Sequence, residues 1–191
     1  MGSSDSGVAE SVAADVASVK NDPTPGVPSM LRRVATIPYE GLLLLALLLI
    51  ASFPIAGLKG YTLSGIPHFI YQLYLLLITA GYFGWLWTHG GQTLPMKTWR
   101  FKVVNRNGAL LSVAQASKRF VIALLFFGPA AAGLVLLFFP ARVNLAITMW
   151  MFLPMVATIW WAKFDPERQF LHDRLSGTML VNALTEAATK R

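Results

Sequence analysis

The chain has 191 residues, of which 55% are hydrophobic and only 13% are charged, and its mean hydropathy is +0.55. Soluble domains carry nearer a quarter charged residues, so this composition excludes an ordinary soluble protein and indicates a chain surrounded by lipid. The absence of cysteine excludes disulfides and thiolate chemistry, and the net charge of +7 does not indicate nucleic acid binding, because the basic residues lie just outside apolar segments.

Residues 1–28 differ from the rest of the chain, since they are small, polar and mildly acidic. The segment ends in "NDPTPGVPS", which has three prolines within six residues and therefore cannot continue a helix or a central strand. We expect a disordered cytoplasmic tail here. It is not a secretory signal, because no basic region followed by a short apolar core occurs at its start.

Four apolar segments are long enough to cross a bilayer, which takes about 20 residues of helix. They lie at about residues 34–57, 68–88, 119–139 and 143–162. The sequence therefore predicts an all-α membrane protein, a four-helix transmembrane bundle within residues 29–183, followed by a short tail at 184–191. One alternative stays open, in which Gly128-Pro129 splits the third segment into a re-entrant pair.

The basic residues predict the orientation of the chain, because cytoplasmic loops of membrane proteins carry an excess of lysine and arginine. One group of them flanks the apolar segments on one side, at Arg32, Arg33, Lys97, Arg100, Lys102, Arg106, Lys118, Arg119, Lys163, Arg168, Arg174, Lys190 and Arg191. The opposite side holds only Lys59 and Arg142. We expect a multi-pass protein with both termini in the cytoplasm.

A small sheet is predicted at the cytoplasmic face. Residues 101–112, "FKVVNRNGALLS", favour a β-hairpin, because Asn107-Gly108 suits a type I′ turn between two runs that favour strands. A two-stranded hairpin alone is marginally stable, and a third strand is available in "TMLVN" at residues 178–182. We expect these pieces to form one sheet under the membrane.

A short interfacial helix is predicted between the fourth apolar segment and that last strand. Asp165 followed by Pro166 suits the start of a helix, as a side-chain cap followed by proline at the first helical position. Gly177 suits its end. Such a helix can lie in the plane of the membrane surface.

Three ordered motifs make residues 30–183 resemble the RDD membrane proteins, a family named for one arginine and two aspartates. Arg33 and Glu40 hold the spacing of the family's first two signature charges. The central loop reads "GQTLPMKTWRFKVV" at 91–104, and the C-terminal motif reads "LHDRLSGTMLV" at 171–181, with Asp173 as the second aspartate.

The chain departs from the family pattern at several positions. Glu40 stands where the family has an aspartate, and Pro95, Met96 and Arg100 replace a glycine, a lysine and a glycine of the central loop. The resemblance implies an integral protein of the bacterial inner membrane, for which transport of a ligand is suggested. It does not supply a substrate.

The signature charges admit two interpretations. Seven residues advance a helix by about 10.5 Å, so Arg33 and Glu40 share a face without having to touch, and Glu40 is expected to meet a base such as Arg119 or Arg174. In the first interpretation Glu40 binds a cation or a proton, and Arg33 and Asp173 tune the pKa of its carboxylate. In the second the three charges form a structural lock between the first span and the C-terminal helix.

Two functions follow. One is transport of a cation or small solute, by a homo-oligomer or within a larger membrane complex, because a lone four-helix unit offers little room for a path. The other is an accessory or scaffold protein whose basic cytoplasmic face, at Lys97, Arg100, Lys102 and Lys118, docks a partner or anionic lipid. No catalytic constellation occurs and the three histidines lack metal-ligand spacing, so we expect no enzyme activity, metal or cofactor.

Overall fold

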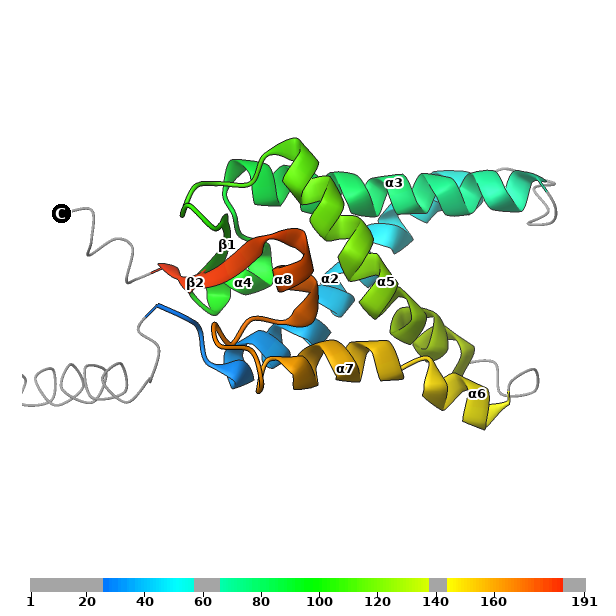
Figure 1. Ribbon diagram of the computed structural model, residues 1–191. Helices are drawn as coiled ribbons and strands as arrows, with labels where there is room; N and C mark the ends of the chain where they lie inside the picture. The colour runs from blue at the N-terminus through cyan, green and yellow to red at the C-terminus, as the bar shows by residue number, and fades with distance from the viewer. Residues whose placement is uncertain (1–25, 57–65, 138–143, 184–191) are drawn as a thin grey trace, which may run out of the picture.

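The computed structural model describes residues 26–56, 66–137 and 144–183 (Figure 1). In chain order its elements are α2 (Met30–Ala56), α3 (Ile66–His89), α4 (Leu94–Thr98), β1 (Phe101–Asn105), α5 (Val113–Leu137), α6 (Leu145–Trp150), α7 (Leu153–Trp161), α8 (Leu171–Ser176) and β2 (Thr178–Asn182). The described chain is therefore mostly helical, with one small sheet.

Three helical segments are long and apolar enough to cross a membrane. They are Met30–Ile55, His68–Thr98 and Val113–Leu137. Their large apolar side chains lie on the outer surface of the protein rather than in a core, for example Leu49, Phe53, Leu77 and Leu125. A soluble monomer rarely exposes contiguous apolar surface on this scale, so these helices suit a lipid environment.

The third predicted span forms one helix, because α5 continues through Gly128 and Pro129 without a break. This confirms a single helix and excludes the re-entrant alternative. The expected end of this span at 138–139, like the end of the first span at residue 57 and the start of the fourth at 143, lies outside the described residues.

The fourth predicted span is not one continuous helix. Its described part forms α6 and α7, which together cover Leu145–Trp161 and are shorter than the three long segments. The chain turns at Met151, and Pro154 lies in the first turn of α7, where its missing N–H group is tolerated. Within a continuous helix the same proline would leave the carbonyl of Trp150 without its bond, which favours an interruption here, whereas α5 accommodates Pro129 inside its helix.

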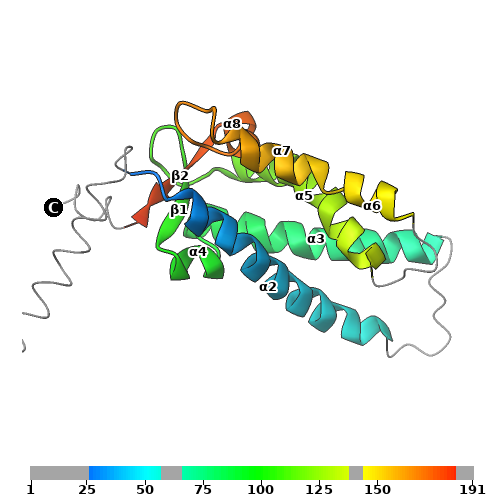
Figure 2. The same cartoon turned by 90° about the horizontal axis from the view of Figure 1, so that it is seen from below.

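The two strands and two of the short helices gather at one end of the long helices (Figures 1 and 2). We call this the sheet end: α4, β1, α8 and β2 with their connections, residues 90–112 and 162–183. Helix α5 lies against α3, α7 and α8, while α2 lies against α3 and α4. Helices α6 and α7 lead the chain back towards the sheet end, where both ends of the described chain lie.

Strands β1 and β2 form an antiparallel pair, in which Phe101 lies opposite Asn182 and Asn105 opposite Thr178. The expected small sheet is thus present, but the expected hairpin is wrong. The turn at Asn107-Gly108 forms, and the backbone N–H of Asn105 donates to the carbonyl of Ala109 at 2.9 Å, yet no return strand follows.

The start of α5 explains the missing return strand. Ser112 and Gln115 form a capping box there: the Ser112 hydroxyl accepts from the N–H of Gln115, and the Gln115 side chain accepts from the N–H of Ser112. The helix therefore begins before a second strand can pair with β1. Strand β2 takes that place from far along the chain.

Irregular segments satisfy both edges of this two-stranded sheet. On the outer edge of β1, the N–H of Val103 donates to the carbonyl of Gly91 at 2.7 Å. On the outer edge of β2, the N–H of Leu180 donates to the side-chain oxygen of Gln169 at 3.0 Å, and the N–H of Asn182 donates to the carbonyl of Gly26 at 2.7 Å. These bonds replace neighbouring strands and remove the exposed edges.

Helix α8 ends where predicted but begins later. Gly177 takes a left-handed conformation with φ of 71° and ends the helix. The helix does not begin at Asp165, because Arg168 has a positive φ of 51° that helical backbone cannot accommodate. The Asp165 carboxylate instead accepts from the N–H groups of Glu167 and Gln169, which closes a turn.

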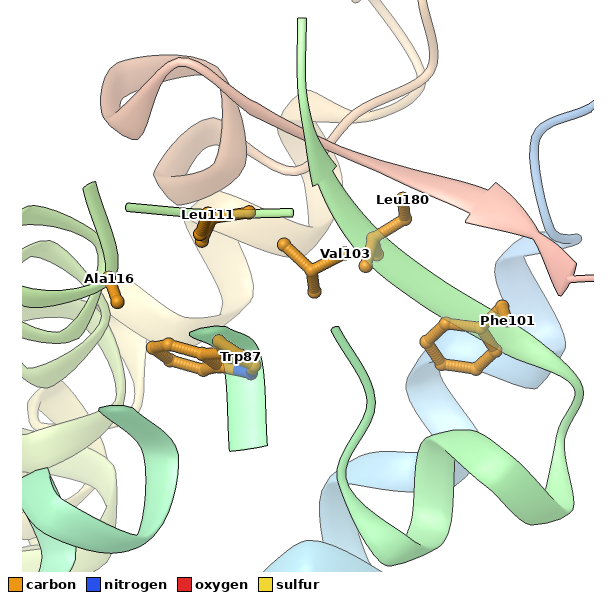
Figure 3. Packing of buried hydrophobic residues seen from close by; sticks show 6 residues of the cluster. All are labelled: Trp87, Phe101, Val103, Leu111, Ala116 and Leu180. Carbon is orange, nitrogen blue, oxygen red and sulfur yellow. The ribbon is translucent and has the colours of Figure 1, made fainter. Parts of the chain in front are cut away.

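The main hydrophobic core lies at the sheet end and not between the long helices. Figure 3 shows it between the end of α3, the sheet and the start of α5: Trp87, Phe101, Val103, Leu111, Ala116 and Leu180, all buried. The long helices expose their apolar surface to the surroundings, so this core is the part of the protein that folds as a water-soluble domain would.

Gly91 gives a direct test of this arrangement. Its φ is +66°, and an added Cβ would lie 2.7 Å from the carbonyl oxygen of Val103, which is backbone and cannot move aside. We expect Gly91→Ala to destabilise the purified protein in detergent by roughly 1–2 kcal/mol or more, from the left-handed conformation and the clash. Gly90→Ala is the control, because its Cβ would meet only Leu86 O at 3.8 Å. Equal melting temperatures for both variants would contradict the arrangement.

Candidate functional site

Glu40 lies on α2, where its carboxylate joins three elements. Its Oε1 accepts a hydrogen bond from the Tyr82 hydroxyl of α3 at 2.9 Å, and its Oε2 accepts one from the Thr93 hydroxyl before α4 at 2.6 Å. Within the described part of the chain, no basic group lies within ion-pair distance of this carboxylate. Glu40 is therefore held by neutral donors.

Thr93 is fully buried and has two roles. Its side chain caps α4 by accepting from the N–H of Met96 at 3.4 Å, while its own proton goes to Glu40. The sequence analysis did not single out Thr93 or Tyr82 as partners of Glu40. The one available signal for Thr93 was its place in the "GQTL" motif, since a threonine before Leu-Pro is a typical helix cap.

Arg33 lies in the first turn of α2, closer to the sheet end than Glu40, and its side chain is buried. Its Nη1 donates to the backbone carbonyl of Arg168 at 2.6 Å, and its guanidinium lies over the ring of Phe170, 4.7 Å from the centroid. Arg33 thereby ties the first turn of α2 to the segment that leads into α8. Its bond to Arg168 and its contact with the Phe170 ring both lie just before the C-terminal motif and do not involve Asp173.

Asp173 forms a buried ion pair with Arg119. Asp173 on α8 is fully buried, and its Oδ1 accepts from Nη1 of Arg119 on α5. The same nitrogen donates to the Thr178 hydroxyl of β2, and the guanidinium lies over the Trp87 ring, 4.9 Å from its centroid. The pair thus connects α5, α8 and β2 at one point. Asp173 Oδ2 and Arg119 Nε have no hydrogen-bond partner within the described residues.

His172, beside Asp173, is buried between Phe127 and Phe170. Its Nδ1 lies 3.2 Å from the Thr158 hydroxyl of α7, and its Nε2 lies 3.3 Å from Asp173 Oδ1. Burial lowers the pKa of His172 from its ordinary 6.5 to about 4, opposed by Asp173 and helped by Arg119 and Arg33. The imidazole is therefore neutral at physiological pH.

The two bases expected near Glu40 lie elsewhere. Arg119 is engaged with Asp173, and Arg174 lies 2.9 Å from Asp165 Oδ1 and 3.6 Å from Glu167 Oε2. The three signature charges accordingly contact three different sets of partners. Glu40 joins α2 to α3 and α4, Arg33 joins α2 to the α8 approach, and Asp173 joins α8 to α5.

The predicted basic face covers part of the sheet end and the start of α5. Lys97 near the end of α4, Arg100 just after it and Lys118 near the start of α5 are exposed, while Lys102 on β1 is half-buried. Arg119, the neighbour of Lys118, turns inward to Asp173. The two residues show that adjacent cations here have different surroundings.

The arrangement at Glu40 suits the binding of a proton or a small cation. A carboxylate and two hydroxyl oxygens are hard oxygen ligands, and they come from three different elements of the fold. The described ranges contain no second candidate site of this kind built on histidine. No group of three histidine or acidic side chains in them could hold a metal ion.

Comparison with known protein families identifies the family of this chain. The model of the RDD family matches residues 27–177, which is well over half of the chain and includes Arg33, Glu40 and Asp173. No curated protein and no solved structure matches. The resemblance seen in the sequence is therefore confirmed at the level of the family.

The Arg119–Asp173 pair predicts a large cost for removing one partner. Arg119→Ala would leave a buried carboxylate without its cation, and we expect a loss of about 3–5 kcal/mol in the free energy of unfolding in detergent. Adding Asp173→Asn to this variant should restore part of the loss, because no charge then stays buried. Arg106→Ala, at an exposed turn residue, is the control. A single variant as stable as this control would show that the pair is not structural.

His172 predicts a pH dependence of stability. The unfolded imidazole takes up a proton below about pH 6.5, whereas the folded one resists protonation until about pH 4. The stability that depends on a neutral His172 is therefore complete above pH 6.5 and lost as the pH falls towards 4. We expect the stability difference between wild type and His172→Gln to shrink across this window, measured by thermal unfolding in detergent. His89→Gln, at an exposed histidine, should follow the wild type; a constant difference for His172→Gln would contradict the assignment.

Proposed function

The chain belongs to the RDD family of membrane proteins, and from this premise we propose that it transports a proton or small cation, or a small solute coupled to one, with Glu40 as the binding group. The proposal rests on one observation: the carboxylate of Glu40, within a segment long enough to cross a membrane, is held by two neutral hydroxyls.

The chemistry of this acid supports binding rather than a lock. A carboxylate in apolar surroundings is costly as an anion, and either a proton or a cation removes that cost. An acid that serves only as a lock is usually paired with a base, as Asp173 is with Arg119. The Tyr82 and Thr93 hydroxyls can keep contact with Glu40 in either state, because a hydroxyl both donates and accepts.

The distribution of charge supports a cytoplasmic sheet end. The described basic residues lie at this end of the helices, as the excess of cations in cytoplasmic loops leads us to expect. The hydrogen bond between Asn182 and Gly26 brings both ends of the described chain together, so both termini would face the same side. The α6–α7 segment would then return the chain across the bilayer, in the inner membrane of a bacterium.

A second function is favoured by the exposed cations of the predicted basic face. Lys97, Arg100 and Lys118 are all exposed and could dock an acidic partner or anionic lipid. In that case the protein is an accessory or scaffold subunit and Glu40 fixes α2 against α3.

The transport proposal further requires an oligomer or larger complex, because three long helices and a shorter pair leave little room for a path.

Reconstitution in liposomes tests the transport proposal. The full chain is placed in vesicles with a pH-sensitive dye inside, and flux is measured under imposed proton, sodium and potassium gradients. We expect flux in the wild type and a loss of about tenfold or more in Glu40→Gln, because an amide neither takes up a proton nor supplies the negative charge that balances a bound cation.

Glu167→Gln is the matched control, since it makes the same chemical change at an acid near the Arg174 side chain, outside the long helices. Its flux should stay close to that of the wild type. Flux that survives Glu40→Gln would remove Glu40 from the mechanism. A folded wild-type protein with no flux under any gradient would count against transport and favour the docking function.

A further inference from the structure

A cavity of about 300 Å³ lies at the sheet end, between the start of α2 and the chain that follows α7. Its walls include Ser29 and Met30 from the α2 side, Ala162 and Lys163 after α7, and Arg168. Arg33 forms part of the wall and donates to the carbonyl of Arg168, which fixes the two sides to each other. Figure 1 shows the beginning of α2 and the end of α7 next to each other at this place.

The lining of this cavity is basic. It includes Arg33, Lys163 and Arg168, and among the described residues that line it none is acidic. The nearest acids in the sequence, Asp165 and Glu167, lie against Arg174 instead. Lys163 and Arg168 are exposed and make no ion pair within the described ranges, so their charges are available to an anion.

The opening of α2 adds to the attraction for an anion. The backbone N–H groups of a helix's first turn have no partners within the helix, and the helix dipole favours negative charge at this end. Residues Val27 to Met30 line the cavity at that point. This contribution supplements the side-chain charges and could not define a site without them.

Exposed apolar side chains neighbour the lining residues of the cavity in the sequence. Leu31 follows its α2 wall and is 78% exposed, and Phe164 follows Lys163 and is 69% exposed. Trp160 is also exposed, with Nζ of Lys163 4.1 Å from its ring centroid. Cations beside exposed tryptophan and aliphatic residues mark the level at which lipid headgroups meet acyl chains.

We infer that this cavity binds the phosphate of an anionic phospholipid, with Lys163 and Arg168 as the ligands of the headgroup and Leu31 and Phe164 beside the acyl chains. Basic pockets between helices at the cytoplasmic face are a recurring form of headgroup site. The volume is at the lower end of that of ligand pockets, about 300–1,000 Å³, which suits a headgroup better than a larger solute. The site is independent of Glu40 and of the exposed face at Lys97 and Arg100.

Native mass spectrometry of the full chain in a neutral detergent tests the inference. Phosphatidylglycerol and phosphatidylcholine of the same acyl composition are titrated, and the affinity for the first bound lipid is measured. We expect the wild type to prefer phosphatidylglycerol by about tenfold or more, and Lys163→Gln/Arg168→Gln to lose this preference. Both residues are exposed, so the variant should fold; a thermal unfolding measurement verifies it.

The control variant is Lys97→Gln/Arg100→Gln, which removes the same charge from exposed residues outside the cavity. It should keep the preference. The site would be overturned if both variants lost the preference for phosphatidylglycerol equally, or if Lys163→Gln/Arg168→Gln kept it. Inorganic phosphate is titrated separately, and its effect on the melting temperature is compared between the wild type and the Lys163→Gln/Arg168→Gln variant. If phosphate stabilises only the wild type, and phosphatidylglycerol is bound no better than phosphatidylcholine, the ligand is free phosphate and the lipid assignment is wrong.

Discussion

The ion pair between Arg119 and Asp173 is the interaction on which the sheet end depends. It joins a long helix, α5, to a helix of six residues, α8, and through Thr178 to β2. A helix as short as α8 has no stability of its own, so its position must come from tertiary contacts. A buried pair costs desolvation on both sides and adds little net stability, but it defines one arrangement, because every other arrangement leaves a charge buried alone.

The same demand for partners explains the irregular backbone around the sheet. Two strands alone leave two unpaired edges, and these are filled by the Gly91 carbonyl on one side and by Gln169 and the Gly26 carbonyl on the other. A side-chain amide offers the same donor and acceptor as a peptide group, so Gln169 replaces a residue of a third strand. The sheet end is therefore a small domain in which the irregular segments between helices and strands make much of the hydrogen bonding.

The helices and strands could largely be predicted from local sequence, whereas their partners could not. Long apolar runs predict α2, α3 and α5, and β-branched residues predict β1 and β2. The bonds of Glu40 reach across 42 and 53 residues, and that of Arg119 to Asp173 across 54, distances over which no periodicity operates. Lys118 and Arg119 illustrate the limit: counting cations treats them alike, but α5 turns one outward and the other into the core.

Local rules also failed where two of them competed for the same residues. Asn107-Gly108 forms its turn, but the capping box of Ser112 and Gln115 begins α5 before a return strand can form. Asp165-Pro166 has the chemistry of a helix start, yet Arg33 holds the Arg168 carbonyl in a non-helical segment. In the first case one local signal, the capping box of α5, outranked another. In the second, a contact from a distant helix outranked the local preference, because burying a guanidinium without partners costs more than a turn of helix gains.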